Sequence, residues 1–207
     1  MRSRIFLEGG PPSDGEPNKH LDIECRQSFR RLLESCGLRG RVPRLVACGS
    51  RSSAFREFSA AHRAAAAGDY VAMLIDSEDP VADSNKLWDH LRVRDGWRKP
   101  AGAKEEQVLL MVTCMETWIV ADRPTLRKHY GSRLQDSALP SLRDLEVRHR
   151  DDVQERLARA TRNCTNAYEK GTRSFLILEK LSPDELHQHL PSFRRTIDVL
   201  KATLPPA

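Results

Sequence analysis

Residues 70–80 read YVAMLIDSEDP, an apolar run that changes abruptly into acidic residues. The run from Tyr70 to Ile75 has the length of a strand, and its lack of apolar–polar alternation is typical of a strand buried on both faces. The polar group Asp76-Ser77-Glu78-Asp79 follows it directly. A wholly apolar strand gives no structural reason for four polar residues at its end, so this position favours a functional role.

Shorter apolar runs on either side of this strand alternate with amphipathic segments. Strands are expected at residues 4–7, 45–48, 70–75 and 108–113. Helices are expected at residues 21–36, 52–67 and 83–93, and in the segment that carries Glu116. This alternation predicts an α/β fold in which a mostly parallel sheet is covered by helices on both faces, with right-handed crossovers.

The signals change after residue 122, where only helical patterns follow. They fall at residues 124–130, 151–161, 173–181 and 183–204, whereas residues 9–20 and 96–103 are expected to be loops. We therefore expect an α/β domain over residues 1–122 and a helical C-terminal extension over residues 123–207. The two parts are expected to pack together as one structural unit.

Composition narrows the class of protein without naming a function. The chain has 207 residues with 34 Lys and Arg against 29 Asp and Glu, a net charge of +5 that is compatible with nucleic acid but only weakly diagnostic. The five cysteines show no paired spacing, which favours a reducing cytoplasm over a disulfide framework. No apolar run suits a signal peptide or a membrane span, so no membrane partner is expected.

Acidic residues also follow two other predicted strands. Glu8 ends the first strand and precedes Gly9-Gly10, and Glu116 lies just after the fourth strand. Because the carboxyl ends of parallel strands meet at one edge of a sheet, we expect these acids to lie near Asp76. Clustered carboxylates repel one another unless a hard cation such as Mg²⁺ or Mn²⁺ neutralises them. Each acid has a structural alternative: Glu8 as a solvated loop residue, and Glu116 as an acid that complements a helix dipole.

Two segments are candidates for phosphate binding. Ser50 and Arg51 lie in GSRSS (49–53), which opens a helix, although a capped helix start is the favoured interpretation because no Walker-A lysine is present. Lys170 and Arg173 lie in KGTR (170–173), a basic turn that is as compatible with solvent as with a phosphodiester. The histidines and cysteines lack zinc-site spacing, and no nucleophile-elbow motif is present.

Three segments together resemble a bacterial family called domain of unknown function 4276, which is similar to a divergent Toprim domain. They are IFLEG (5–9), LIDSED (74–79) and CMETWIVAD (114–122). Toprim domains carry a glutamate after the first strand, which matches Glu8, and an Asp-x-Asp after a later strand, which matches Asp76 and Glu78. Glu replaces the second Asp here, and Asp79 is the alternative ligand. The glutamate and tryptophan that the family carries on a helix match Glu116 and Trp118.

The resemblance implies a Mg²⁺- or Mn²⁺-dependent nuclease that hydrolyses DNA or RNA, with a link to phage defence. Glu8, Asp76, Glu78 or Asp79 would hold the metal, Glu116 would support it, and a basic residue of the C-terminal part, for which Lys170 is the candidate, would meet phosphate. The resemblance also implies an ATPase partner by analogy. Two alternatives stay open: a non-catalytic Toprim-like module that binds such an ATPase, and a phosphotransfer protein with Asp76 as phosphoacceptor.

Overall fold

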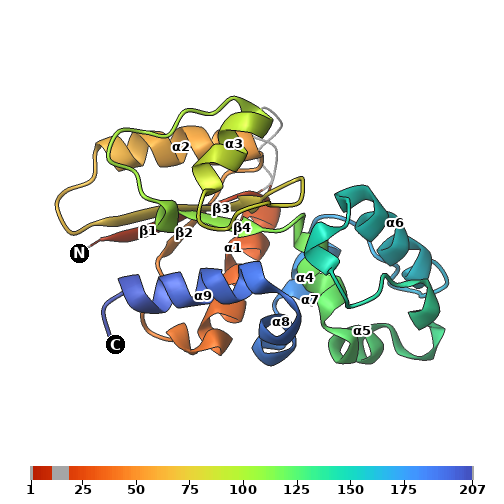
Figure 1. Cartoon of the computed structure of the whole chain (residues 1–207). Coiled ribbons are helices and arrows are strands. Elements are labelled where there is room, and N and C mark those ends of the chain that lie inside the picture. Colours follow the sequence, from red (N-terminus) through yellow and green to blue (C-terminus); the bar gives the residue numbers. More distant parts are fainter. Residues whose placement is uncertain (1, 11–18, 207) are drawn as a thin grey trace.

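The computed structural model describes residues 2–10 and 19–206 and shows an α/β protein (Figure 1). Its sheet has four parallel strands in the order β2-β1-β3-β4. The strands are β1 (Ser3–Leu7), β2 (Arg44–Ala47), β3 (Tyr70–Asp76) and β4 (Val108–Met111). The α/β class and the parallel sheet expected from the sequence are therefore confirmed. Residues 11–18, which belong to the loop predicted at 9–20, lie outside the described residues.

Strand β3 occupies a central position because both of its faces are apolar. It pairs with β1 on one side and β4 on the other, and all seven of its residues are buried. Val71, Met73 and Ile75 contribute to one hydrophobic cluster, and Ala72 and Leu74 contribute to another. The apolar run that opened the sequence analysis thus supplies both layers of the core.

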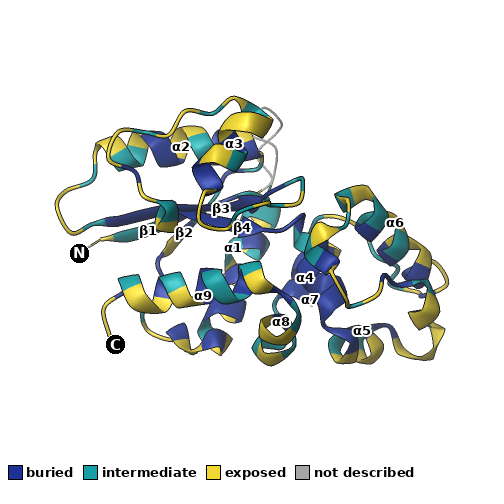
Figure 2. Ribbon diagram, in the orientation of Figure 1, coloured by how far each residue is buried: buried dark blue, intermediate teal, exposed yellow. Residues whose placement is uncertain are grey.

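Helices cover both faces of the sheet. In Figure 1, α2 and α3 lie above the sheet, and α1 and α9 lie below it. The α-helices are α1 (Lys19–Leu33), α2 (Arg51–Arg63), α3 (Leu87–Asp95), α4 (Met115–Ala121), α5 (Arg123–Tyr130), α6 (Arg150–Thr161), α7 (Thr172–Leu178), α8 (Pro183–His189) and α9 (Pro191–Thr203). Shorter turns are η1 (Glu34–Leu38), η2 (Glu105–Gln107), η3 (Gly131–Arg133), η4 (Asp136–Ala138) and η5 (Leu145–Val147). Figure 2 shows dark, buried strands between helices whose outer faces are exposed.

Several predicted helices have different bounds in the structure. The helix predicted at 52–67 ends at Arg63, and the single helix predicted at 183–204 is two helices, because Pro191 has no N–H to continue the first one and instead begins the second. The helix predicted from Asp83 begins only at Leu87. The Asp83 carboxylate accepts a hydrogen bond from the Asn85 N–H at 2.9 Å, which forms a turn in place of the first helical residues.

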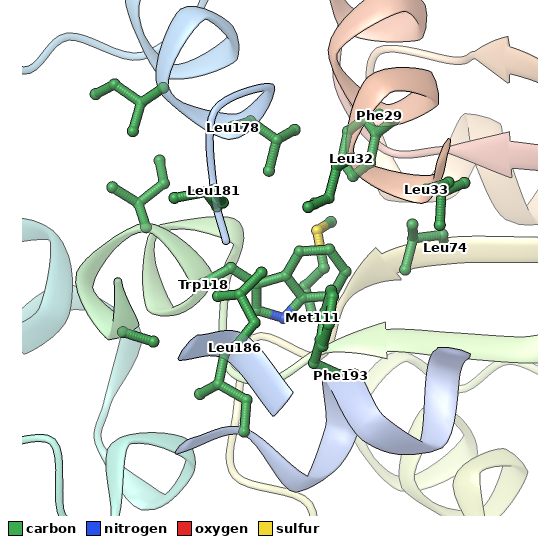
Figure 3. Packing of buried hydrophobic residues seen from close by; sticks show 14 of the residues in the cluster. Phe29, Leu32, Leu33, Leu74, Met111, Trp118, Leu178, Leu181, Leu186 and Phe193 are labelled. Carbon is green, nitrogen blue, oxygen red and sulfur yellow. The ribbon is translucent and has the colours of Figure 1, made fainter. Parts of the chain in front are cut away.

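The helices that follow residue 122 share a hydrophobic core with the lower face of the sheet. Figure 3 shows Trp118 of α4 beside Phe193 of α9, with Met111 of β4 close to both. The two rings meet edge to face, with centroids 5.0 Å apart. Trp118 is 1% exposed, so it packs in the core and offers no stacking surface to a base.

Two further sequence features have structural outcomes. All five cysteines are free and buried, in accord with the absence of paired spacing. Within residues 2–10 and 19–206, no helix combines the length and apolar character that crossing a membrane requires.

Candidate metal centre

Glu8 and Asp76 meet at the carboxyl edge of the sheet because β1 and β3 are neighbours in register. Leu7 is paired with Leu74, and the Glu8 N–H donates to the Leu74 carbonyl at 3.0 Å. The carboxylate of Glu8 then turns back and accepts a hydrogen bond from the Asp76 N–H at 2.9 Å. Residues 68 positions apart are thus joined at one strand edge, as the sequence predicted.

The glycines after Glu8 allow a close approach of two backbone segments. Gly9 and Gly49 exchange two N–H to carbonyl hydrogen bonds of 3.0 and 2.9 Å. Gly9 has a φ of +119°, and a Cβ there would lie 3.3 Å from the Cys25 sulfur. A larger residue is therefore disfavoured at the wall of the cavity that Glu8 lines, which has a volume of about 200 Å³.

Three carboxylates come close enough to share one cation. Oxygens of Glu8, Asp76 and Glu78 all lie within 4.8 Å of one another. These are all oxygen donors, the kind that a hard divalent cation prefers. The donor set therefore fits Mg²⁺ or Mn²⁺, and its three members are among the acids that the sequence analysis named as candidate ligands.

Burial makes the charge of Glu8 costly. It raises the pKa of Glu8 to about 7, and it outweighs the hydrogen bond from the Asp76 N–H and the charges of Arg51, Arg150 and Lys170, all of which lower the pKa. Glu8 therefore carries a proton more readily than an ordinary glutamate does. An added cation would restore its charged form.

The surroundings of Asp76 also disfavour its charged form. Burial raises the pKa of Asp76 well above its ordinary value, and the negative charges of Glu8 and Glu116 raise it further. The charge of Arg150 and a hydrogen bond of 2.8 Å from the Met115 N–H oppose this rise. Such crowding of buried acids, whose pKa values rise despite nearby positive charges, is a property of metal centres and of catalytic sites.

Glu116 lines the same cavity and is held by residues of the C-terminal part. Its carboxylate accepts a hydrogen bond of 2.6 Å from the Tyr168 hydroxyl and one of 3.1 Å from the Gln154 amide. The Lys170 ammonium lies 3.9 Å from the same carboxylate. The structure thus brings Glu116 and Lys170 to the acidic cluster, whereas sequence reasoning missed Tyr168 and Gln154, which lie in no motif.

Asp79 lies apart from the donor set. Its side chain is 50% exposed and pairs with Arg94 at 3.1 Å. Glu78 takes the inward position instead: its backbone φ is +69°, and its N–H donates to the Thr113 carbonyl at 2.8 Å. The structure thus brings Glu78, and not Asp79, to Glu8 and Asp76.

Two arginines that the sequence analysis did not single out face Glu78. Arg94 of α3 lies 3.3 Å from the Glu78 carboxylate, and Arg150, the first residue of α6, forms an ion pair with the same oxygen. Arg150 is 72 positions from Glu78, and no local pattern connects the two residues. Only the packing of α6 against α4 places Arg150 there.

The predicted phosphate-binding residues have different positions. The Ser50 hydroxyl accepts a hydrogen bond of 3.2 Å from the Ser53 N–H, so Ser50 is the N-cap of α2. Arg173 donates to the Ala167 carbonyl at 2.9 Å and pairs with Glu169 at 3.5 Å, which stabilises its own turn. The structure therefore gives both residues local structural contacts and brings neither to the acidic cluster.

Arg51 lies beside Glu8. Its guanidinium donates two hydrogen bonds to Asp95, at 2.9 and 3.1 Å, and lies 5.0 Å from the centroid of the Trp97 ring. Its Nε lies 3.7 Å from the Glu8 carboxylate. Arg51 is thus committed to Asp95 and Glu8, and its positive charge favours the ionised form of Glu8.

Comparison with known proteins identifies a family without an assigned activity. A family model described as a domain of unknown function, DUF4276, matches residues 20–201. The matched range contains Asp76, Glu78, Glu116, Arg150 and Lys170, whereas Glu8 precedes it. No curated protein and no solved structure matches the chain.

Proposed function

The chain belongs to the DUF4276 family, and from the acidic cluster that its fold assembles we propose that it is a divalent-cation-dependent phosphodiester hydrolase acting on nucleic acid. The observation that carries this proposal is the convergence of Glu8, Asp76 and Glu78, whose oxygens lie within 4.8 Å of one another. The proposal extends the resemblance to Toprim domains, in which acids at the same strand ends bind metal. Mg²⁺ is the proposed cofactor, with Mn²⁺ as its substitute.

Each acid has a distinct part in this proposal. Asp76 and Glu78 hold the cation, and the Met115 N–H fixes one oxygen of Asp76. A bound divalent cation supplies Lewis acidity towards a phosphate group and lowers the pKa of water. Glu8 holds the cation or accepts a proton, and its pKa of about 7 suits proton transfer near neutral pH.

The remaining residues orient these acids and meet the substrate. Glu116, fixed by Tyr168 and Gln154, supports the cation from the side of α4. Lys170 keeps 59% of its side chain exposed at the rim of the same cavity, and this leaves its ammonium free to approach a phosphate. The net charge of +5 accords with a polyanionic substrate.

A cleavage assay with matched variants tests the proposal. We expect the purified protein to cleave DNA or RNA in Mg²⁺ or Mn²⁺ and to lose this activity with a chelator. Asp76→Asn and Glu8→Gln should each abolish cleavage, because an amide keeps the shape but loses the charge that holds a hard cation. Asp89→Asn is the control, since Asp89 is an exposed acid that pairs only with Arg92 of the same helix among the described residues. Equal activity of Asp76→Asn and the wild type would contradict the proposal.

The alternative function is a non-catalytic module that binds a partner ATPase, in a phage-defence setting. It predicts a protein that shows no cleavage in any cation and whose cellular role survives Glu8→Gln and Asp76→Asn. The assay is therefore run on the protein alone and on the protein with any ATPase that is encoded beside it. Cleavage that appears only in the second setting supports both an enzyme and a partner.

A further inference from the structure

Arg150 of α6 contacts the acidic cluster from the part of the chain that follows residue 122. It forms an ion pair with Glu78, and its side chain is 23% exposed. Its charge also lowers the pKa of Glu8 and that of Asp76. One guanidinium thus acts on all three acids that are the proposed cation ligands.

The position of Arg150 in its own helix gives no reason for a positively charged residue. It is the first residue of α6, where the helix dipole favours negative charge, and Asp151 and Asp152 follow in the same turn. A positive residue is therefore unfavourable at this helix end, and neither of these acids is within ion-pairing distance of Arg150. The favourable contact of Arg150 is the one with Glu78.

The neighbouring arginines differ from Arg150 in the number of their partners. Arg94 pairs with Glu78 at 3.3 Å, with Asp79 at 3.1 Å and with Asp95 at 2.5 Å. Arg51 is bound to Asp95 through two hydrogen bonds. If Glu78 bound a metal cation instead, Arg94 and Arg51 would each still have a carboxylate partner. Among the described residues, Arg150 has no other carboxylate within ion-pairing distance.

From these contacts we propose that Arg150 competes with the divalent cation for Glu78 and that, once displaced, its guanidinium binds a phosphate group of the nucleic acid. The inference rests on the proposed function and names the residue that links cation binding to substrate binding. A guanidinium is suited to both partners because its planar fork matches a carboxylate and a phosphate equally well. Cation and nucleic acid would then bind cooperatively, since the first partner releases the group that holds the second.

Two binding measurements on Arg150→Ala test this inference without relying on turnover. Titration calorimetry of chelator-treated protein with Mn²⁺ measures cation binding. Fluorescence anisotropy of a labelled single-stranded oligodeoxynucleotide, with Ca²⁺ present to suppress cleavage, measures substrate binding. We expect Arg150→Ala to bind Mn²⁺ about five-fold more tightly and the oligonucleotide about ten-fold more weakly than the wild type, within the range of ordinary coupling energies. If Arg150 had only a structural role, Arg150→Ala would bind both Mn²⁺ and the oligonucleotide more weakly.

Further variants keep the test decisive. Arg156→Ala removes one positive charge from the same helix, where Arg156 pairs with Asp152 at 2.6 Å, and should change neither affinity. Arg150→Lys keeps the charge but loses the fork, so it should bind Mn²⁺ like the wild type and the oligonucleotide more weakly. Arg150→Gln, which also removes the charge but keeps a longer polar side chain, replaces Arg150→Ala if that variant does not fold.

The outcomes separate this inference from the proposed function. If wild type fails to bind Mn²⁺, the proposed cation-dependent function is wrong and the inference fails with it. If wild type binds Mn²⁺ but Arg150→Ala binds it no more tightly, only the inference is overturned. Unchanged oligonucleotide binding by Arg150→Ala and Arg150→Lys would likewise overturn the inference and leave the metal centre intact.

Discussion

At the scale of single residues, the site depends on how two acids are desolvated and hydrogen-bonded. Glu8 sits where burial opposes its charge, and Glu116 sits where three polar groups surround it. The two glutamates lie at the same cavity. Glu8 and Glu116 are therefore expected to contribute differently to the stability of the fold. The difference can be measured as a free energy of unfolding.

Glu8 should make the stability of the metal-free protein depend on pH. Its pKa rises from 4.5 in the unfolded chain to about 7 in the fold, so the folded state binds the proton more tightly. The resulting stabilisation is fully present below pH 4.5 and is lost as the pH rises through about 7. Against Glu8→Gln, we expect the wild type to lose at most about 3 kcal/mol of unfolding free energy between acidic and alkaline pH. Urea denaturation with a chelator at both ends of this range measures the difference, and parallel pH profiles would contradict the expectation.

The Tyr168 hydroxyl should contribute to stability through Glu116. Tyr168→Phe removes the 2.6 Å hydrogen bond to Glu116, a residue that is only 2% exposed. We expect the free energy of unfolding to fall by about 2 kcal/mol, as for other hydrogen bonds to charged groups. Tyr130→Phe is the matched control. The Tyr130 hydroxyl is buried without a hydrogen-bond partner among the described residues, so its removal should be neutral or stabilising. Equal losses of melting temperature in the two variants would contradict this assignment.

At the scale of secondary-structure elements, Asp122 connects two helices. It is fully buried, and one carboxylate oxygen accepts a hydrogen bond of 2.9 Å from the Thr125 N–H at the start of α5. The other oxygen accepts one of 2.7 Å from the Ser182 N–H, directly before α8. The last residue of the CMETWIVAD segment is therefore a structural cap that sets where two helices begin.

Asp122→Ala should be strongly destabilising, because it leaves two backbone N–H groups without their partner. We expect a loss of about 3 kcal/mol, which combines a lost helix cap with an unsatisfied buried donor. Asp136→Ala is the control, since Asp136 forms a surface pair with Arg127 and should change the stability by less than about 1 kcal/mol. Urea denaturation in the presence of a chelator compares the two variants. A small effect of Asp122→Ala would show that water replaces the lost carboxylate.

At the scale of the whole molecule, both the sheet and the C-terminal part of the chain supply residues to the site. Glu8 and Asp76 come from strand ends, whereas Lys170 at the same cavity, Arg150 at Glu78 and Tyr168 at Glu116 come from the part of the chain that follows residue 122. A cation bound among these residues would therefore contact elements from both parts of the chain. Cation binding should then stabilise the fold as a whole.

Mg²⁺ should raise the melting temperature of the wild type but not that of Asp76→Asn. At a concentration of about 100 times the Kd, a ligand that binds only the folded state adds about 2.7 kcal/mol. Without metal, Asp76→Asn should be as stable as the wild type or more stable, because the amide removes a charge that Glu8 and Glu116 repel while its oxygen still accepts from Met115. Thermal denaturation with Mg²⁺ and with a chelator measures both effects. Equal Mg²⁺ responses would count against Asp76 as a ligand.

The sequence by itself determined the architecture and the edge of the sheet at which the acids gather. An uninterrupted apolar run at 70–75 is sufficient to predict a central parallel strand, because only burial on both faces stabilises it. Once the strands are parallel, their carboxyl ends share one edge, so Glu8 and Asp76 could be predicted as neighbours. These are consequences of local pattern and backbone geometry, which one sequence reveals.

Only the tertiary structure decided which side chains complete the site. It turned Glu78 inward and Asp79 outward, directed Arg51 to Asp95, and brought Arg150 to the acids from a helix far along the chain. Ion pairs and hydrogen bonds between distant side chains follow from the packing of helices on a shared core, and no period or motif in the sequence encodes that packing. Glu8 and Asp76 could therefore be predicted from the sequence, whereas the choice of Glu78 over Asp79 and the contacts of the surrounding arginines could not.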